Sequence, residues 1–429
     1  MEKCPICLAP LTPKGNCTFC RYQVNPPGFV RTWVVPVLGL VIFSVALGYY
    51  AIEVFKPLMT DMVSSFSSNS TEYSASVPPP ETTYNPDNYP QLSATEIREL
   101  RSLFDNQLFE QLNERFDAFQ AAAEEDPRNE KLLLRACDTF ALADNELRPN
   151  FDLWITLFPE HYAPYLARAE HTLALALERR GTAYASETSE EQFAQMHDYL
   201  RETEADLDAA RQINPRLVPA YVNAITIHNL EGNESLEQEV FDTGRVYAPA
   251  SFALYDSMLW AHKPRWGGSY CEMDTLIRQA LEYSEQNPKL YMLFVSPYAD
   301  LAWYARRDKD YDKALELYAT ALAYGESFYI YRERAKTYRL MQNYSQAYAD
   351  IQRSLELEST SIRNHIEAAR ILYKLGDLDA SILHVYEATL LAPEDKELPE
   401  MQDWALRVTP RSTLDNREEV TRVLSLAVY

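Results

Sequence analysis

The chain has 429 residues, of which 47% are hydrophobic and 12% aromatic, and its formal net charge at pH 7 is −23. This composition supplies enough apolar side chains for a sizeable folded core and excludes a protein that is disordered throughout. The large negative charge disfavours general binding to nucleic acid. Six cysteines, four of them between Cys4 and Cys20, do not follow the pattern of a secreted disulfide scaffold.

The N-terminal cysteines form two pairs with the spacing of a metal site. In CPICLAPLTPKGNCTFC, two residues separate Cys4 from Cys7 and Cys17 from Cys20. Two such turns can present four thiolates in the tetrahedral shell that Zn²⁺ prefers, with no open position for a reacting water. We therefore expect a structural zinc ribbon over residues 1–24, with iron in a rubredoxin-like site as the alternative. The segment resembles the short zinc ribbons at the N-termini of many bacterial membrane proteins.

Residues 32–54 have the apolar character of a membrane-spanning helix. No charged side chain occurs from Thr32 to Ile52, a length sufficient to cross a bilayer core. A cleaved signal peptide is the competing interpretation, but it would need a short basic region where the cysteine module stands. Most nearby positive charges precede the segment, so the positive-inside rule predicts a single-pass protein of a bacterial inner membrane, with its N-terminus cytoplasmic and its C-terminal body periplasmic.

The segment 61–92 contains many Ser, Thr and Pro residues and no Lys or Arg. A segment of this composition cannot bury a core. We therefore expect a disordered, extended and mildly acidic linker between the membrane helix and the rest of the protein.

From Ser93 onward the sequence shows helical periodicity. Ser93 and Glu96 have the spacing of a capping box, and apolar residues then recur every three or four positions. Nearer the C-terminus, Tyr311, Tyr344 and Leu378 recur with a period of about 34 residues, and small residues stand at fixed offsets where antiparallel helices could approach closely. This pattern resembles the tetratricopeptide repeat and predicts a solenoid of antiparallel helix pairs.

The predicted fold class is therefore all-α: a tetratricopeptide-like α-solenoid preceded by a small zinc ribbon and one transmembrane helix. A helical repeat-like domain is expected over residues 93–290. Three tetratricopeptide-like repeats are expected over 295–395, and C-terminal capping helices over 397–429.

Residues 93–290 also resemble an uncharacterised bacterial family known only as domain of unknown function 4034. The stretches LWITLFPEHYAPYLARAEHTLALA and KPRWGGSYCEM carry the resemblance, which implies a helical repeat module and no known activity. We interpret the second stretch as a turn between two helices, in which Gly267 and Gly268 supply positive φ angles. Arg265 and Trp266 remain candidates for a ligand clamp.

No motif in the sequence indicates catalysis. Phosphate-binding loops, dinucleotide fingerprints, nucleophile elbows and zinc-protease motifs do not occur, and the seven histidines are scattered. Paired acids on helices are usually solvated. We therefore expect no enzyme activity. Cys137 and Cys271 could form a disulfide or remain two buried thiols, and the sequence leaves both possibilities open.

A stripe of cations follows the face that tetratricopeptide modules usually use for binding. At helix-A positions 2, 5, 9, 12 and 13 of the three C-terminal repeats, eight of fifteen residues are Arg or Lys and none is acidic. The candidate groove residues are Trp303, Arg306, Arg307, Tyr329, Arg332, Lys336, Arg339, Arg363, Arg370, Tyr373 and Lys374.

This stripe suits acidic peptide segments or the C-termini of other proteins, because guanidinium groups bind carboxylates in a bidentate manner. Two other interpretations stay open: the cations offset acids on helix B, such as Asp350, Glu356 and Glu358, or the groove receives the protein's own acidic linker.

The sequence thus predicts a membrane-anchored protein-protein interaction scaffold whose helical-repeat body binds partner proteins or acidic peptides. One alternative is a transmembrane sensor or regulator that couples the zinc ribbon to binding in the cell envelope. Another is an enzyme or cell-wall-acting factor with a site near Arg265 and Trp266.

Overall fold

A computed structural model of the protein describes four ranges of residues, which form α-helices and short 3₁₀ helices and contain no strand. The all-α class predicted from the sequence is therefore confirmed for this part of the protein. The described ranges are 73–81, 89–182, 187–392 and 398–426.

The structure contradicts the localisation predicted from the sequence. Within the described ranges, no helix combines the length and the apolar character needed to cross a membrane. The prediction of a bacterial inner-membrane location, with a cytoplasmic N-terminus and a periplasmic body, is corrected by this finding. The predicted membrane helix at 32–54 and the predicted zinc ribbon at 1–24 themselves lie outside the described residues.

The described residues divide into two compact units. The small unit contains residues 73–78 and 262–275, and the large unit contains the other described residues.

In sequence order, the helices before the C-terminal repeats are α2 (Ala94–Asp105), α3 (Phe109–Glu125), α4 (Glu130–Asp138), α5 (Arg148–Leu157), α6 (Tyr162–Arg180), α7 (Glu190–Ile213), α8 (Val218–Glu231), α9 (Glu234–Tyr247), α10 (Phe252–Ala261) and α11 (Tyr270–Leu281).

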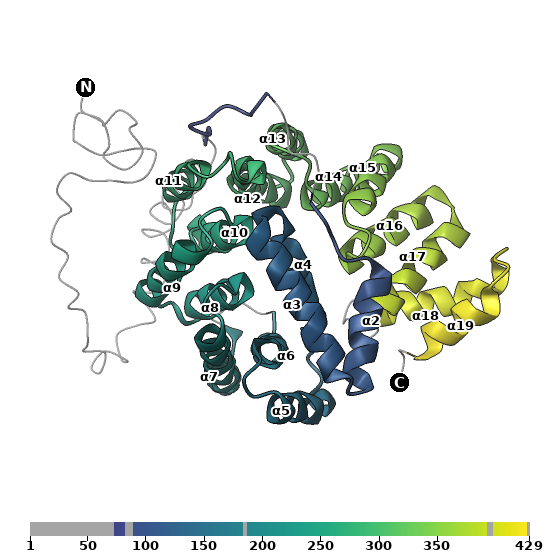
Figure 1. The fold of residues 1–429 in the computed structure, drawn as a ribbon. Coiled ribbons are helices and arrows are strands. Elements are labelled where there is room, and N and C mark those ends of the chain that lie inside the picture. The colour runs from purple at the N-terminus through teal and green to yellow at the C-terminus, as the bar shows by residue number, and fades with distance from the viewer. Residues whose placement is uncertain (1–72, 82–88, 183–186, 393–397, 427–429) are drawn as a thin grey trace, which may run out of the picture. The chain divides into compact units, whose positions relative to one another are not determined.

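The C-terminal part of the large unit is a series of antiparallel helix pairs, in which we call the first helix A and the second helix B (Figure 1). Its helices are α12 (Val295–Arg307), α13 (Tyr311–Ala323), α14 (Phe328–Leu340), α15 (Tyr344–Leu357), α16 (Ile362–Leu375), α17 (Leu378–Leu391), α18 (Leu398–Val408) and α19 (Arg417–Leu426).

Small residues allow the two helices of each C-terminal pair to approach closely. Tyr311, Tyr344 and Leu378, whose spacing predicts the repeat, each begin a helix B. In the pair α16–α17, the Ser381 hydroxyl donates a hydrogen bond to the Ala369 carbonyl at 2.8 Å, a distance that a larger side chain would prevent. The small residues at these interfaces are at most 1% exposed: Ala302, Ala314, Ala335, Ala347, Ala369 and Ser381.

The N-terminal helices share an apolar core with the helices that follow them. Trp154 is fully buried in this core, with its ring stacked on Phe109 at 5.5 Å between centroids. Its indole N–H donates to Asn113 Oδ1 at 3.0 Å, so the polar atom of the buried ring is satisfied. This core extends from α2 to α8 and fixes the N-terminal helices to the first half of the large unit.

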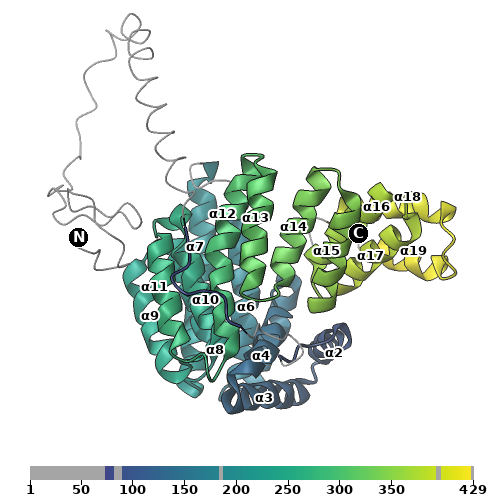
Figure 2. The same ribbon diagram turned by 90° about the horizontal axis from the view of Figure 1, so that it is seen from above.

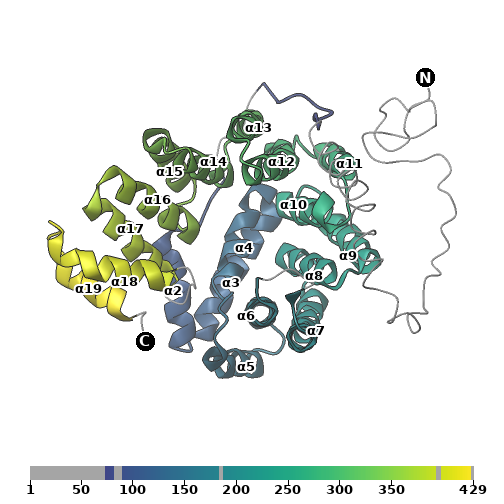
Figure 3. The ribbon, with the colours of Figure 1, turned by 180° about the vertical axis from the view of Figure 1, so that it is seen from behind.

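Helices α2, α3 and α4, which we call the N-terminal layer, meet the repeats at turns that join one pair to the next. Figures 1 and 3 show α3 and α4 running across the paired helices, and Figure 2 shows the layer near the ends of those helices. The Ser251 hydroxyl and the Ala253 amide both donate to the Glu130 carboxylate, at 2.5 and 3.1 Å. Glu130 of α4 therefore caps the N-terminus of α10, where a negative charge is stabilised by the helix dipole.

The layer reaches the last repeats through polar contacts. Lys131 Nζ lies 2.6 Å from Glu358 Oε2, at the C-terminus of α15, and Arg135 donates to the Thr360 hydroxyl at 2.9 Å. Further along, Arg101 Nη1 donates to the Leu391 carbonyl at 2.7 Å. These contacts join residues more than 200 positions apart in the sequence and hold the C-terminal repeats against the N-terminal layer.

Two described parts of the predicted linker 61–92 make defined contacts. In the small unit, Tyr73 is 9% exposed, and its hydroxyl donates to Asp274 Oδ1 at 3.2 Å. In the large unit, the Tyr89 hydroxyl donates to Asn287 Oδ1 at 3.2 Å and accepts from the Lys289 amide at 3.0 Å. Two tyrosines of this polar segment are thus anchored by hydrogen bonds.

The turn of the small unit needs its two glycines for different reasons. After a 3₁₀ helix at Pro264–Trp266, Gly267 has φ 104°, a conformation that disfavours other residues. Gly268 does not have a positive φ, contrary to our expectation. A Cβ at Gly268 would instead lie 2.1 Å from the His262 carbonyl oxygen, so the backbone itself excludes a side chain. Ser269 then caps the next helix by accepting from the Glu272 amide at 3.2 Å.

The two described cysteines are not joined by a disulfide. Cys137 and Cys271 are both buried and neither takes part in a disulfide, which decides between the two possibilities left by the sequence. Burial raises the pKa of the Cys137 thiol well above its ordinary value, and the nearby Glu170 carboxylate adds to the effect. Cys137 is therefore a packed, unreactive thiol at neutral pH.

We predict that Lys131 and Glu358 are energetically coupled. Burial favours the neutral form of Glu358, but Lys131 and the Thr360 hydrogen bond outweigh it and lower the pKa of the carboxyl. Lys131→Met should therefore reduce the free energy of unfolding by about 2–3 kcal/mol, since Glu358 keeps its charge without its partner. In the double variant Lys131→Met/Glu358→Gln, part of the loss should be recovered. Chemical denaturation of both single variants and the double variant measures the coupling, and strictly additive losses would contradict it.

This pair should also make stability depend on pH. Because the pKa of Glu358 is lower in the folded protein, its contribution is complete above the ordinary glutamate pKa and is lost as the pH falls through the folded value. The wild type should therefore lose more stability on acidification than Lys131→Met. If the free energy of unfolding changed with pH in the same way in both proteins, the pair would not contribute to the pH dependence of stability.

We predict that Gly268→Ala destabilises the protein more than the same substitution at a glycine where the added Cβ would meet no other atom. The new Cβ must displace the backbone at His262, at a cost of roughly 2 kcal/mol or more. Gly376 provides the control, because it has φ 85° but a Cβ added there would meet no atom within 4 Å. Gly376→Ala should therefore cost only about 1 kcal/mol. Equal losses in denaturant titrations of the two variants would contradict the close approach at His262.

Candidate functional site: the cation-rich face of the C-terminal repeats

The candidate groove residues all lie on α12, α14 or α16, which are the A helices of three consecutive pairs. Each of these helices also contains one acid, and the three acids recur with the same period as the helices. Asp300, Glu333 and Glu367 are 1%, 8% and 3% exposed. The sequence-based prediction did not include these acids, because they stand next to the positions that were expected to face a ligand. Their spacing is nevertheless that of the repeat.

Glu333 of α14 binds two arginines of the predicted groove. Arg306 of α12 donates to one carboxylate oxygen at 2.7 Å, and Arg332 donates to the other at 3.4 Å. The side chains of Arg306 and Arg332 are only 10% and 16% exposed, so these ion pairs are largely removed from water. Glu333 therefore links α12 to α14.

Glu367 repeats this arrangement one pair further on. Arg339 of α14 donates to Glu367 through Nε and, at 3.3 Å, through Nη2. Arg370, on the same helix as Glu367, lies 3.8 Å from it. We call these six residues the Arg–acid ladder: Arg306, Arg332, Glu333, Arg339, Glu367 and Arg370.

The acids of helix B have other partners. Asp350 pairs with Arg334 at 2.7 Å, and Glu356 pairs with Arg353 at 2.8 Å. Glu358 pairs with Lys131 of the N-terminal layer. Four groove arginines are thus paired with acids of the A helices, rather than with these acids of helix B: Arg306, Arg332, Arg339 and Arg370. A fifth, Arg307, pairs with Asp308 at the end of α12.

Lys336 lies between the two steps of the ladder. Its side chain is half-buried, and this burial lowers the pKa of the ammonium group. The carboxylates of Glu333 and Glu367 oppose the shift, while Arg306 and Arg339 add to it. A positive charge at this position is therefore incompletely stabilised, and an additional anion beside it would be favourable.

The outer end of the face combines exposed cations with aromatic rings. On α16, Arg363, Arg370 and Lys374 are exposed. Tyr373 is 52% exposed and packs edge-to-face on Trp404, with 5.3 Å between ring centroids.

A similar combination occurs at the other helices of the face. On α14, Tyr329 is 37% exposed, and the Arg332 guanidinium lies 5.1 Å from its ring centroid. On α12, the exposed Arg307 lies 5.3 Å from the ring centroid of Trp303. Rings held beside cations in this way can contact the apolar parts of a bound peptide while the cations bind its charges.

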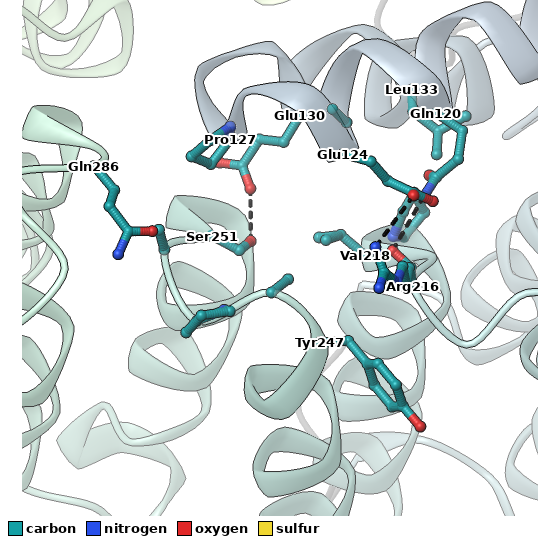
Figure 4. A pocket seen from close by; sticks show the side chains of 15 residues that line it. Gln120, Glu124, Pro127, Glu130, Leu133, Arg216, Val218, Tyr247, Ser251 and Gln286 are labelled. Atoms are coloured by element: carbon teal, nitrogen blue, oxygen red, sulfur yellow. Dashed lines mark hydrogen bonds and ion pairs between the residues drawn. The ribbon is translucent and has the colours of Figure 1, made fainter.

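A hollow of about 200 Å³ lies between the N-terminal layer and the turns before α8 and α10 (Figure 4). Its buried carboxylate, Glu130, already receives the hydrogen bonds of Ser251 and Ala253. Arg216 lies at its edge, 3.4 Å from Glu124. The polar groups of this hollow thus join α3 and α4 to the repeats, and we assign it a structural role.

The remaining predicted site residues lie in two other parts of the sequence. Arg265 and Trp266 lie in the short 3₁₀ helix of the small unit, and Trp266 is 44% exposed. Among the described residues, no three His, Cys, Asp or Glu side chains are arranged to hold a metal ion. The predicted zinc ligands lie outside the described residues: Cys4, Cys7, Cys17 and Cys20.

Comparison with known proteins yields limited matches. No protein-family model matches the sequence, so membership of the domain-of-unknown-function-4034 family stays a prediction. Among curated proteins, protein unc-45 homolog B of Xenopus laevis is 29% identical over 99 residues. That match covers 22% of this chain and 11% of the relative, so it spans only a small part of that protein.

Several solved structures share the helical architecture at low similarity. Yeast Tom70 gives a TM-score of 0.42 at 16% identity, covering 88% of this chain and 77% of that one. Pseudomonas aeruginosa pilF gives 0.29 at 14% identity, covering 55% and 97%. A thermophilic TPR protein of Thermus thermophilus gives 0.25 at 16% identity, covering 56% and 99%. At these scores the fold assignment rests on the helix pairs described above.

The repeated helix pairs define the class of the protein. Its C-terminal pairs recur with a constant period, use small residues at their interfaces and have equivalent acids on their A helices. The protein is therefore a tetratricopeptide-like helical-repeat protein.

We predict that Glu333 contributes to stability through its two arginines. Glu333→Gln should reduce the free energy of unfolding by about 1–3 kcal/mol, because Arg306 and Arg332 lose a shared, little-exposed carboxylate. Glu316→Gln is the control, because Glu316 is 68% exposed and pairs with Lys313 on the surface of α13. That variant should change stability by less than about 0.5 kcal/mol. Similar losses in chemical denaturation of the two variants would contradict a specific role for the ladder.

Proposed function

We propose that the helical-repeat body is a protein-interaction scaffold and that the face of α12, α14 and α16 binds acidic segments of partner proteins. One observation carries this proposal: each A helix of this face has a single acid but at least two cations. On α14, Glu333 is accompanied by Arg332, Lys336 and Arg339. The ladder therefore offsets only part of the positive charge of the face.

The chemistry of the face supports a peptide ligand. Arginine binds carboxylates through two parallel N–H groups, which gives both affinity and orientation. The exposed parts of Tyr329 and Tyr373 offer apolar surface beside the cations. A net charge of −23 on the whole protein makes this localised positive face more selective, because anions are repelled from most of the remaining surface.

The face offers recognition groups and no arrangement for bond-making. Its groups are guanidinium and ammonium cations, tyrosine and tryptophan rings, and acids already shared by arginines. We therefore propose binding, without a catalytic step, as the role of this site. The partner would be an acidic, extended stretch of another protein or an acidic C-terminus.

We predict that an acidic peptide binds through Arg370. In a fluorescence-anisotropy titration with a labelled Glu- and Ser-containing peptide, Arg370→Gln should weaken binding roughly tenfold, the value of one charge-assisted hydrogen bond. Arg245→Gln is a matched control, because Arg245 and Arg370 have the same 42% side-chain exposure and each pairs with an acid three residues away. The control should bind like the wild type. Equal effects of both substitutions would argue against a site on this face.

We also propose that Cys4, Cys7, Cys17 and Cys20 hold one structural zinc ion, on the strength of their spacing. Elemental analysis of the purified full-length protein should find about one zinc per molecule. Zinc should be lost in Cys4→Ser/Cys17→Ser and kept in the control Cys137→Ser, whose thiol is free and buried. Iron in the wild type would favour the rubredoxin-like alternative, and an unchanged zinc content in the double variant would exclude these ligands.

A further inference from the structure

A groove lies between α7 and α9, in a part of the large unit that shares no helix with the cation-rich face. Helix α8 packs against both α7 and α9, and a space of about 380 Å³ opens between these two helices. The residues that line the two walls recur every three or four positions, which places them on one side of each helix. They are Glu204, Asp208, Arg211 and Gln212 on α7, and Leu236, Glu239, Val240, Thr243 and Tyr247 on α9.

Apolar side chains line much of this α7–α9 groove. Leu236 and Tyr247, at opposite ends of the α9 wall, are both exposed. Tyr221 of α8 also lines the groove, and its ring stacks with that of Tyr247 at 6.5 Å between centroids. The Tyr221 hydroxyl donates to the Pro215 carbonyl at 2.8 Å, which holds the ring in place. The groove therefore offers ordered apolar surface to a ligand.

The walls of the α7–α9 groove are acidic. Glu204 and Asp208 stand on α7, and Glu239 stands on α9. Arg211 also lines the groove, but its guanidinium is paired with Asp208 at 2.5 Å. The acidic character extends along the helices, because residues 190–247 contain twelve Asp or Glu, four Arg and no Lys. Their net charge is therefore −8, about a third of the −23 of the whole chain.

A buried histidine of the α7–α9 groove has an unsatisfied ring nitrogen. His228 of α8 is 3% exposed, and its Nε2 atom lies 3.5 Å from Glu204 Oε1. With the ring hydrogen on Nε2, which faces this carboxylate, Nδ1 is a hydrogen-bond acceptor. Nδ1 makes no hydrogen bond to any residue that the structure describes. An acceptor without a donor, beside a carboxylate, favours a ligand that brings N–H groups.

The dimensions of the α7–α9 groove fit a short helix. From Leu236 to Tyr247 the α9 wall is about 16 Å long at a rise of 1.5 Å per residue, which is the length of three helical turns. A helix can rest between two others when its side chains fill the groove between them. A helix with an apolar stripe beside basic residues would match both the apolar surface and the acidic walls.

We infer that the α7–α9 groove binds an amphipathic helix of a partner protein, with large apolar residues along one side and Lys or Arg beside them. The apolar residues contact Leu236, Tyr221 and Tyr247, while the cations lie against Glu204 and Glu239. The ligand has the opposite charge to the one proposed for the cation-rich face. The scaffold thus has two binding surfaces, one for a basic segment and one for an acidic segment.

The test compares two labelled peptides that contain the same Leu, Lys and Ala residues in different orders. In the first peptide the leucines recur every three or four positions and form one stripe, and in the second they are distributed around the helix. The wild-type protein should bind the first peptide about tenfold more tightly in fluorescence-anisotropy titrations at physiological salt. Equal affinities would reveal only the general attraction of a basic peptide to an acidic protein, and would overturn the inference.

Substitutions in the groove locate the peptide. Leu236→Gln and Glu239→Gln should each weaken binding of the first peptide severalfold, because one removes apolar contact and the other removes a carboxylate. Leu177→Gln is the control for the leucine, since Leu177 of α6 is 43% exposed and Leu236 is 40% exposed. Glu316→Gln on α13 is the control for the exposed glutamate. Both controls should bind like the wild type, and equal losses in variants and controls would contradict binding in this groove.

Two further measurements separate this surface from the cation-rich face and from self-association. Arg370→Gln, on the cation-rich face, should leave the affinity for the basic peptide unchanged, and a loss of affinity would contradict two separate surfaces. Sedimentation velocity should show no dimer that the basic peptide dissociates. Such a dimer would mean that a second copy of this chain occupies the groove, which would overturn the assignment to a partner helix.

Discussion

The proposed site depends on one kind of interaction. Helices α14 and α16 each hold a buried carboxylate that is paired with two arginines. Glu333 and Glu367 are almost completely buried, and such charges are tolerated only when they are paired and hydrogen-bonded. Each of the two acids takes one arginine from its own helix and one from the preceding A helix. The pairing therefore joins consecutive A helices and leaves the face with more positive than negative charge.

The N-terminal layer fixes the repeats that carry this face. It is joined to α5–α8 by an apolar core around Trp154, and to the last repeats by polar contacts such as Lys131 with Glu358. Apolar contacts are strong and non-directional, whereas ion pairs demand a particular geometry. The layer thus holds the C-terminal pairs in one arrangement, which a ligand that spans three helices requires.

The sequence predicts the parts of the fold that depend on local patterns. Ser93 and Glu96 mark a helix start, and the period of Tyr311, Tyr344 and Leu378 marks the helix pairs, because caps and close packing need particular residues at fixed spacing. Contacts of the N-terminal layer could not be predicted, since they join residues more than 200 positions apart without any shared motif. The ladder acids follow the repeat spacing, but an acid on a charged helix is usually solvated, so nothing local indicates their pairing with the preceding A helix.

Zero-length carbodiimide cross-linking between an acidic peptide and the protein tests the central claim most directly, because it joins a carboxylate only to an amine in contact with it. With a peptide that contains several acids, mass spectrometry should find the peptide attached to Lys336 and, beside Arg370, to Lys374. Attachment mainly to Lys313, which lies on the B helix α13 and not on the proposed face, would contradict the account.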